Sequence, residues 1–154
     1  MSNPADGADL EAVASALNSG AIHLLRNLAA VDRQSGLTPA RLSALSVIVF
    51  AGPRQLGALA AAEGVAGPTM TRIVDGLVDA GLAERRADPR DGRAAVIAPT
   101  AAGEKLMCAA AGRRVAVIAS AIAELSAADR RRLTAAAGLL DRVARTVRER
   151  SPAR

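Results

Sequence analysis

The fold of this 154-residue chain is decided by residues 59–82, LAAAEGVAGPTMTRIVDGLVDAGL. This stretch predicts two helices joined by a tight turn. Ala60 is small enough for the second helix to cross the first, and Gly64 tolerates the positive φ that the turn requires. Gly67 can cap the second helix, and Pro68 suits its first position. The spacing is typical of a helix-turn-helix; the alternative is an ordinary helical corner.

The second helix, residues 68–80, is expected to bury one face and expose the other. Its apolar residues recur at i, i+3, i+4, i+7 and i+8 from Met70, which places them on a single face. The opposite face carries short polar side chains and one arginine near the helix N-terminus. Such a face suits contact with phosphates and base edges in the major groove of DNA. The candidate DNA-contacting residues are Pro68, Thr69, Thr71 and Arg72.

A β-hairpin is expected directly after this helix. Residues 82–86 and 94–98 are strand candidates, and the polar segment between them, residues 87–93, is rich in turn residues. A helix-turn-helix followed by such a hairpin is a winged helix, in which the hairpin is the wing.

The tip of the wing carries charges of both signs. Arg90 and Arg93 can enter a minor groove or contact phosphates. Asp88 and Asp91 are interpreted as orienting these arginines by bidentate pairing, which would hold the cations in a fixed pose. The alternative is a solvated turn with no partner.

Long helices are expected on both sides of the winged helix. Residues 10–31 carry an apolar seam with alternating spacings of three and four, which suits packing against another long helix. Thr100 is expected to cap a helix that runs to about Glu124, and Ser126 begins the last helix in a pattern like a capping box. A monomer would leave the seam largely uncovered, so a homodimer is predicted. The fold class is mainly α with a small β-hairpin wing.

Composition excludes several classes of protein. Phe50 is the only aromatic residue, which argues against the stacking of bases from single-stranded nucleic acid. Cys108 and His23 are the only cysteine and histidine, too few for a disulfide framework or a zinc site. No catalytic set is visible, so an enzyme is not expected, nor is a cofactor.

The ends and the apolar runs of the chain bear on its location. The first eleven residues are acidic, unlike a signal peptide. The apolar runs without a charge are too short to span a bilayer. We therefore expect a soluble, cytoplasmic protein with no membrane partner.

The net charge of +5 is unevenly distributed. Residues 113–154 carry ten basic and four acidic groups, a net charge of +6, whereas residues 65–99 carry five of each. The expected DNA-contacting segment is therefore neutral in sum. DNA binding there depends on where the arginines lie and not on net charge.

Segment 59–103 resembles the MarR (multiple antibiotic resistance regulator) family of bacterial transcription factors. The helices before and after this segment extend the resemblance over nearly the whole chain. The wing pattern, Asp-x-Arg-Asp-x-Arg, is its most specific part. The resemblance is carried by Leu59-Ala60, Val65 to Arg72, Gly81-Leu82-Ala83-Glu84-Arg85-Arg86, Asp88-Pro-Arg-Asp-Gly-Arg93 and Thr100-Ala-Ala-Gly103.

The resemblance implies an obligate dimer that binds a palindromic operator in double-stranded DNA. It implies dimerisation helices in residues 1–36 and 100–150, a winged helix-turn-helix DNA-binding domain in residues 37–99, and a tail in residues 151–154. It also implies a repressor that is released by a small aromatic or phenolic effector. The effector would bind between the dimerisation helices and the winged domain. His23 and Asn27, on the first helix, are candidate contacts with such a ligand, and the alternative for His23 is a solvated or interface residue.

The chain departs from the usual family pattern at two places. The turn before the second helix has Ala66-Gly67 where the family usually has Ser or a similar cap. Pro99 stands where Leu is more usual, so the second strand is expected to end early.

Two alternative functions remain at this point. One is a winged-helix module that binds another protein, against which the basic wing argues. The other is an oxidant-sensing regulator that uses Cys108. A cysteine on an alanine-rich helix is more often a small buried apolar residue, which disfavours the second alternative.

Overall fold

The structure, a computed structural model, describes residues 4–88 and 95–150. It is mainly helical with one small antiparallel sheet, so the predicted fold class is confirmed. The elements in chain order are α1 (Pro4–Asp32), the 3-10 helix η1 (Arg33–Ser35), α2 (Pro39–Phe50), β1 (Arg54–Gln55), α3 (Leu56–Glu63), α4 (Gly67–Asp79), β2 (Ala83–Ala87), β3 (Ala95–Pro99), α5 (Ala101–Ala123) and α6 (Ala127–Arg150).

Side-chain caps begin the long helices where the sequence predicts them. Thr100 Oγ1 accepts a hydrogen bond from the Gly103 N–H at 3.1 Å and starts α5. Ser126 Oγ accepts from the Asp129 N–H at 3.1 Å and donates to the Asp129 carboxylate at 2.6 Å. The first of these hydrogen bonds satisfies one backbone donor that the first turn of α6 would otherwise leave free, and the second holds the two side chains together.

The sheet has three strands in the order β1-β3-β2, where a two-stranded hairpin was expected. The additional strand, β1, pairs antiparallel with β3 through Arg54 opposite Ile97 and Gln55 opposite Val96. A strand of two residues is too short to show an alternating apolar pattern, so only its tertiary pairing reveals it.

The expectation that Pro99 ends the second strand early is wrong. β3 includes Pro99, which pairs with Ala83. The N–H of the next residue, Thr100, donates to the Leu82 carbonyl at 3.1 Å. Because bonding positions alternate along an antiparallel pair, Pro99 falls at a position that needs no N–H directed at β2.

The core lies where α2, α3 and α4 pack on the sheet and on the first turns of α5. Its members are aliphatic residues and methionines, and no described polar side chain is buried among them. The largest fully buried side chains are Leu45, Ile48, Leu59, Met70, Leu77, Ile97 and Val74. This core fixes α4 relative to the sheet, and therefore the helix relative to the wing.

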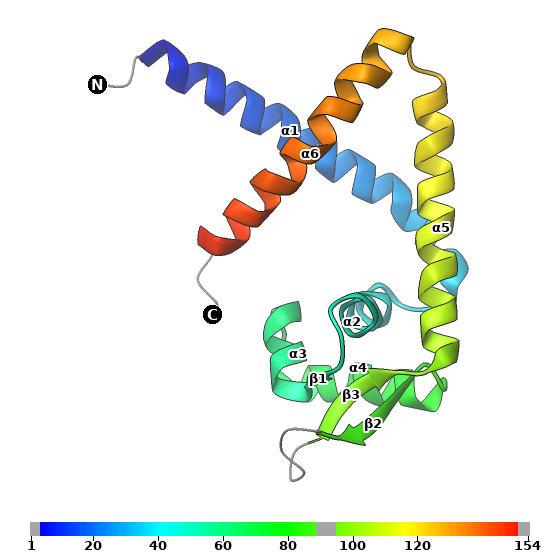
Figure 1. The fold of residues 1–154 in the computed structure, drawn as a ribbon. Helices are drawn as coiled ribbons and strands as arrows, with labels where there is room; N and C mark the ends of the chain where they lie inside the picture. Colours follow the sequence, from blue (N-terminus) through cyan, green and yellow to red (C-terminus); the bar gives the residue numbers. More distant parts are fainter. Residues whose placement is uncertain (1–3, 89–94, 151–154) are drawn as a thin grey trace.

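Helices α1, α5 and α6 extend away from this core (Figure 1). α5 leads out from the winged part, and α6 turns back from its far end. The apolar seam of α1 is buried at Leu28, which is 5% exposed, but lies open toward Leu10, which is 70% exposed. Among the described side chains of α6, Ala136 is half-buried and the others are exposed. The protomer therefore leaves long apolar surfaces uncovered, as the sequence predicts.

By length and composition alone, α5 could cross a membrane, with a mean hydropathy of 1.6. The sequence-based expectation rests on apolar runs without any charge, whereas this mean hydropathy is taken over a stretch that contains charged residues. Arg113 and Arg114 interrupt the apolar stretch of this helix. An arginine at the centre of a membrane-spanning helix costs about 2.5–3.5 kcal/mol in a bilayer. α5 also packs against α2 and β3, and its buried residues, Gly103, Met107 and Ala110, all lie in its first half.

Candidate nucleic-acid interface

The turn between α3 and α4 has the geometry that the sequence predicts. Gly64 has φ of +64°, in the left-handed region that favours glycine. The Val65 N–H donates to the Ala60 carbonyl at 3.1 Å and closes the end of α3. Ala60 itself is buried, at 6% exposed, in the core cluster that also contains α4 residues.

The start of α4 lies one residue earlier than predicted. Ala66, and not Gly67, is the N-cap, and its side chain offers no hydrogen-bond acceptor. The Ala66 carbonyl accepts from the N–H groups of Thr69 and Met70. The first turn of α4 is thus an exposed helix N-terminus without a side-chain cap. Because Pro68 has no N–H and those of Thr69 and Met70 are used, only the Gly67 N–H of this turn is left to meet an anion.

The two faces of α4 separate as expected. Met70, Val74 and Leu77 are buried, whereas Pro68, Thr69 and Arg72 are exposed. These three exposed candidates lie together in the N-terminal half of the helix. Their exposure makes them available to a partner, as contact with base edges and phosphates requires.

Thr71 differs from the other candidate residues of α4. It is half-buried, and its hydroxyl donates to the Gly67 carbonyl at 3.0 Å. Its hydroxyl hydrogen is therefore used within the helix. The oxygen lone pairs and the methyl group remain for a contact with a base.

An ion pair that the sequence analysis missed ties α4 to the wing. Arg85 on β2 donates to Asp75 on α4 at 2.6 Å, and both side chains are about half exposed, at 43% and 47%. The pair neutralises an acidic group on the same helix as Arg72. No local pattern could have identified it, because the turn between α4 and β2 decides which side chains meet.

The base of the wing contains further polar contacts. Gln55 on β1 donates to the Asp88 carboxylate at 2.9 Å, and Arg86 pairs with Glu84. Arg90, Asp91 and Arg93 lie outside the described residues. The role of Asp88 and Asp91 in orienting the arginines therefore stays a prediction.

A cavity of about 440 Å³ lies beside the winged part, between the end of α1, α2 and α5. Most of its wall is apolar. The lining residues are Ala29, Asp32, Arg33, Leu37, Pro39, Leu42, Ser43, Ser46, Phe50, Met107, Ala110, Ala111 and Arg114. The volume falls within the range of pockets that hold small organic ligands.

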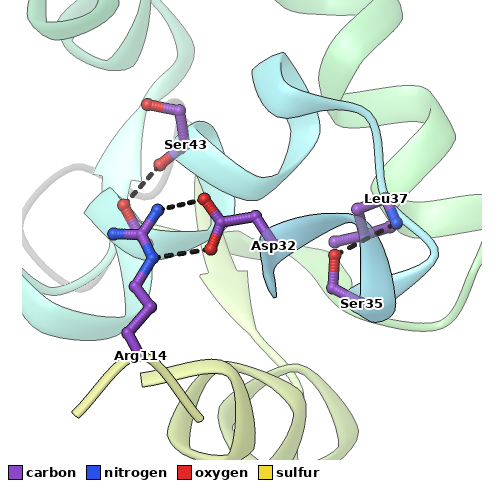
Figure 2. A network of polar contacts seen from close by, with 6 residues as sticks. Asp32, Ser35, Leu37, Ser43 and Arg114 are labelled. Carbon is purple, nitrogen blue, oxygen red and sulfur yellow. Dashed lines mark hydrogen bonds and ion pairs between the residues drawn. The ribbon is translucent and has the colours of Figure 1, made fainter. Parts of the chain in front are cut away.

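An ion pair in the cavity wall joins two segments that are far apart in sequence. Arg114 on α5 donates through Nε to Asp32 Oδ1 at 2.6 Å and through its terminal nitrogen to Oδ2 (Figure 2). Asp32 is the more enclosed partner, with its side chain 19% exposed against 41% for Arg114. The hydrogen bonds from Arg114 hold the pKa of Asp32 below its ordinary value, although burial acts in the opposite direction.

The two sequence-based ligand candidates lie elsewhere. His23 and Asn27 are exposed on α1, and neither is among the residues that line this cavity. The cavity residues were missed because Asp32 and Arg114 are 82 positions apart and neither follows a binding motif.

Cys108 is exposed on α5, so the sequence-based expectation of a buried residue is wrong. The composition of a helix does not show which of its faces meets the core. In the described protomer α5 buries Gly103, Met107 and Ala110, and Cys108 lies off that face.

Comparisons with known proteins agree with this geometry. The model of the MarR family matches residues 35–94. An HTH-type transcriptional regulator of Mycobacterium tuberculosis is 34% identical over 128 residues, which cover 83% of this chain and 90% of that protein.

Solved structures show the same fold. The transcriptional regulator Tm0710 from Thermotoga maritima superposes with a TM-score of 0.77 at 26% identity, over 92% of this chain and 99% of its own. A MarR family protein from Bacillus stearothermophilus gives a TM-score of 0.71 at 21% identity, over 97% of both chains. The second likeness supports the fold alone.

Proposed function

Because the chain belongs to the MarR family of transcriptional regulators, we propose that it is a homodimeric repressor of a palindromic operator. The observation that carries this proposal is the exposed N-terminal half of α4, with Pro68, Thr69 and Arg72 presented together. Thr71 completes the major-groove set. A regulator of this kind acts on DNA in the cytoplasm.

Exposed apolar residues on the end helices support the dimer. Leu17 and Leu24 on α1 are 36% and 49% exposed, and Leu140 and Val143 on α6 are 41% and 47% exposed. Apolar surface of this extent is normally covered, and a second copy of the chain would cover it. Two α4 helices would then lie about one turn of DNA apart, roughly 34 Å.

The wing completes the proposed DNA contact. Arg90 and Arg93 would enter a minor groove or bind phosphates on the flank of each half-site, with Asp88 and Asp91 orienting them. The Arg85–Asp75 pair would keep β2 and α4 in register, so that helix and wing meet the DNA together.

A small organic effector is proposed to control DNA binding from the cavity beside α2. The cavity touches both the dimerisation helices and the winged part, so its occupant can bias their relative position. Phe50, the one aromatic residue of the chain, lines it and can stack on a flat ring.

The test is a footprint and gel-shift titration on the intergenic DNA that flanks the gene, at two salt concentrations. Arg72→Ala should reduce discrimination between operator and random DNA by about 1–3 kcal/mol. Arg90→Ala should weaken binding and flatten its salt dependence. Arg132→Ala, which removes an equally exposed charge at the start of α6, is the matched control and should leave the discrimination between operator and random DNA unchanged.

Two results would change the proposal. If Arg72→Ala and Arg90→Ala bound the operator like the unaltered protein, the assigned interface would be wrong. If no salt-sensitive, competitor-resistant shift appeared, the winged-helix protein-interaction module would be favoured. Peroxide treatment in the same assay tests the oxidant-sensing alternative. That alternative requires peroxide to change DNA binding of the unaltered protein but not of Cys108→Ser.

A further inference from the structure

Arg41 on α2 reaches across to α4 and covers Gly76. A Cβ added at Gly76 would lie within 2.5 Å of Nε, Cζ and Nη2 of Arg41, so the guanidinium takes the place that a side chain at this position would fill. Gly76 is buried beneath it. Glycine is unfavourable inside a helix, and here it has a packing reason, because it makes room for Arg41.

The guanidinium lies on the side of α4 that carries two of the proposed DNA contacts. Gly76 follows Thr69 by seven residues and Arg72 by four, and these spacings place the three positions along one side of the helix. Four residues correspond to about 6 Å of helix axis. Arg41 therefore adds a second cation beside Arg72, and this cation comes from a different element.

No described residue accepts a hydrogen bond from the side chain of Arg41 or forms an ion pair with it. Its backbone N–H donates to Thr38 Oγ1 at 3.3 Å, which leaves the guanidinium uncommitted. Of the two acidic residues of α4, Asp75 pairs with Arg85, and Asp79 forms no ion pair with a described residue. The half-buried Arg41 can thus offer its donors to an anion from outside the chain.

Cations lie on both sides of α4. β2, which carries Arg85, packs on one side of this helix, and α2, which carries Arg41, packs on the other (Figure 1). The major groove of DNA is about 12 Å wide and is bounded by a phosphate backbone on each side. A helix in the groove therefore has one phosphate backbone near the wing and the other near α2.

We propose that Arg41 binds a phosphate of the operator at the edge of the major groove opposite the wing, and that Gly76 is the seat that holds its guanidinium there. A guanidinium matches a phosphate in a bidentate, charge-assisted arrangement. Such a contact fixes the position of α4 in the groove and reads no base. The inference rests on the proposed function, and it adds a contact from outside segment 65–99, which is neutral in sum.

The experiment measures the affinity of the full-length protein for operator DNA and for random DNA of the same length, by fluorescence anisotropy over a series of salt concentrations. Arg41→Ala should weaken binding to both DNAs alike, by about tenfold at low salt. It should also lower the slope of log affinity against log salt by about two per dimer, one phosphate for each protomer. Arg41→Lys, which keeps a cation, should retain most of the slope, and Arg132→Ala on α6 should leave it unchanged.

Gly76→Ala tests the seat of the guanidinium. The added methyl group meets only the far end of the flexible Arg41 side chain, so this variant should fold and lose part of the affinity. In the Arg41→Ala background the same substitution should cause no further loss, because the guanidinium is already absent. Gly112→Ala is the control, since a Cβ there meets nothing within 4 Å, and urea unfolding checks that each variant is folded.

Three outcomes would overturn the inference. The first is unaltered affinity and slope in Arg41→Ala. The second is a loss of discrimination between operator and random DNA at unchanged slope, because Arg41 would then act only by packing on α4. The third is additive losses in the double variant, which would reject the seat at Gly76. Absence of DNA binding by the unaltered protein would instead reject the proposed function, so the two failures are distinguishable.

Discussion

Gly103 lies where the first turn of α5 meets the end of the sheet. A Cβ at this position would lie 2.1 Å from the Leu82 carbonyl oxygen, which is backbone and cannot easily move away. The same carbonyl accepts from the Thr100 N–H, and Thr100 Oγ1 donates to the Gly81 carbonyl at 2.7 Å. The Thr-x-x-Gly segment at residues 100–103 therefore caps α5 and also holds the start of that helix against the end of the sheet.

Gly103→Ala should destabilise the protein, by about 1–3 kcal/mol, because the added methyl group forces the joint apart. Gly112→Ala in the same helix is the control, since a Cβ there meets nothing within 4 Å. That control should be neutral or stabilising, by about 0.5–1 kcal/mol. Urea unfolding measures both, and equal stability of the two variants would contradict the assigned contact.

The Asp32–Arg114 pair should make stability depend on acid pH. The pKa of Asp32 is lowered from 3.8 in the folded protein, so its stabilisation is present above 3.8 and is lost as the pH falls through the folded value. Because Arg114 is partly exposed, the contribution at neutral pH is about 1 kcal/mol.

Asp32→Asn should therefore be less stable than the unaltered protein at pH 7, and the gap should close in acid. Urea unfolding at neutral pH and again well below 3.8 measures this difference. A gap that stayed constant over the whole range would mean that the ionised carboxylate does not contribute.

At the scale of the elements, α4 and the wing act as one unit. The core fixes one side of α4, and the Arg85–Asp75 pair joins its exposed side to β2. Without Arg85, the charge of Asp75 would lie uncompensated on the helix that is proposed to enter a polyanionic groove.

Arg85→Gln should weaken operator binding by about fivefold, the upper range for an exposed pair. The double variant Asp75→Asn with Arg85→Gln should recover most of the loss, because it removes the unpaired carboxylate as well. Fluorescence anisotropy measures the affinity of the unaltered protein, the single variant and the double variant for operator DNA. If the double variant bound as weakly as Arg85→Gln, Arg85 would be a direct DNA contact and not a positioning residue.

At the scale of the whole molecule, the single chain leaves apolar helix faces exposed. Described α6 side chains are almost all exposed, and the seam of α1 is open over most of its length. Most of the basic residues among 113–154 belong to α5 and α6. In a dimer they would add a general attraction for DNA while the neutral winged part supplies selectivity.

Leu140→Glu on α6 should convert the dimer to monomer, because a charge would be buried in an apolar interface. Thr134→Glu, at an exposed polar position of the same helix, should leave the dimer intact. Sedimentation at micromolar concentration measures both. A stable monomer of the unaltered protein would refute the dimer itself.

Features that depend on neighbouring residues were predictable. The caps at Thr100 and Ser126, the left-handed Gly64 and the amphipathic α4 follow from local hydrogen bonding, backbone sterics and helical periodicity. The helix-turn-helix and its wing follow from these elements in order, and the family follows from the residues along them.

Features that depend on distant residues were not predictable. β1 exists because β3 pairs with it, and Pro99 stays in its strand because its nitrogen needs no partner on β2. Cys108 is exposed because the core takes a different face of α5. Each of these depends on which segments meet.

The sequence by itself determined the kind of molecule: a helix-turn-helix with a wing, long apolar end helices, and an exposed face on α4, whose contact with DNA is a proposal. Periodicity, turn residues and caps act within a few residues, so they can be recognised without coordinates. Only the tertiary structure decided that Asp32 meets Arg114, that Arg85 meets Asp75, and that a cavity with excess positive charge lies beside the winged part. Those contacts join separate elements, and packing of the common core sets the distances between them.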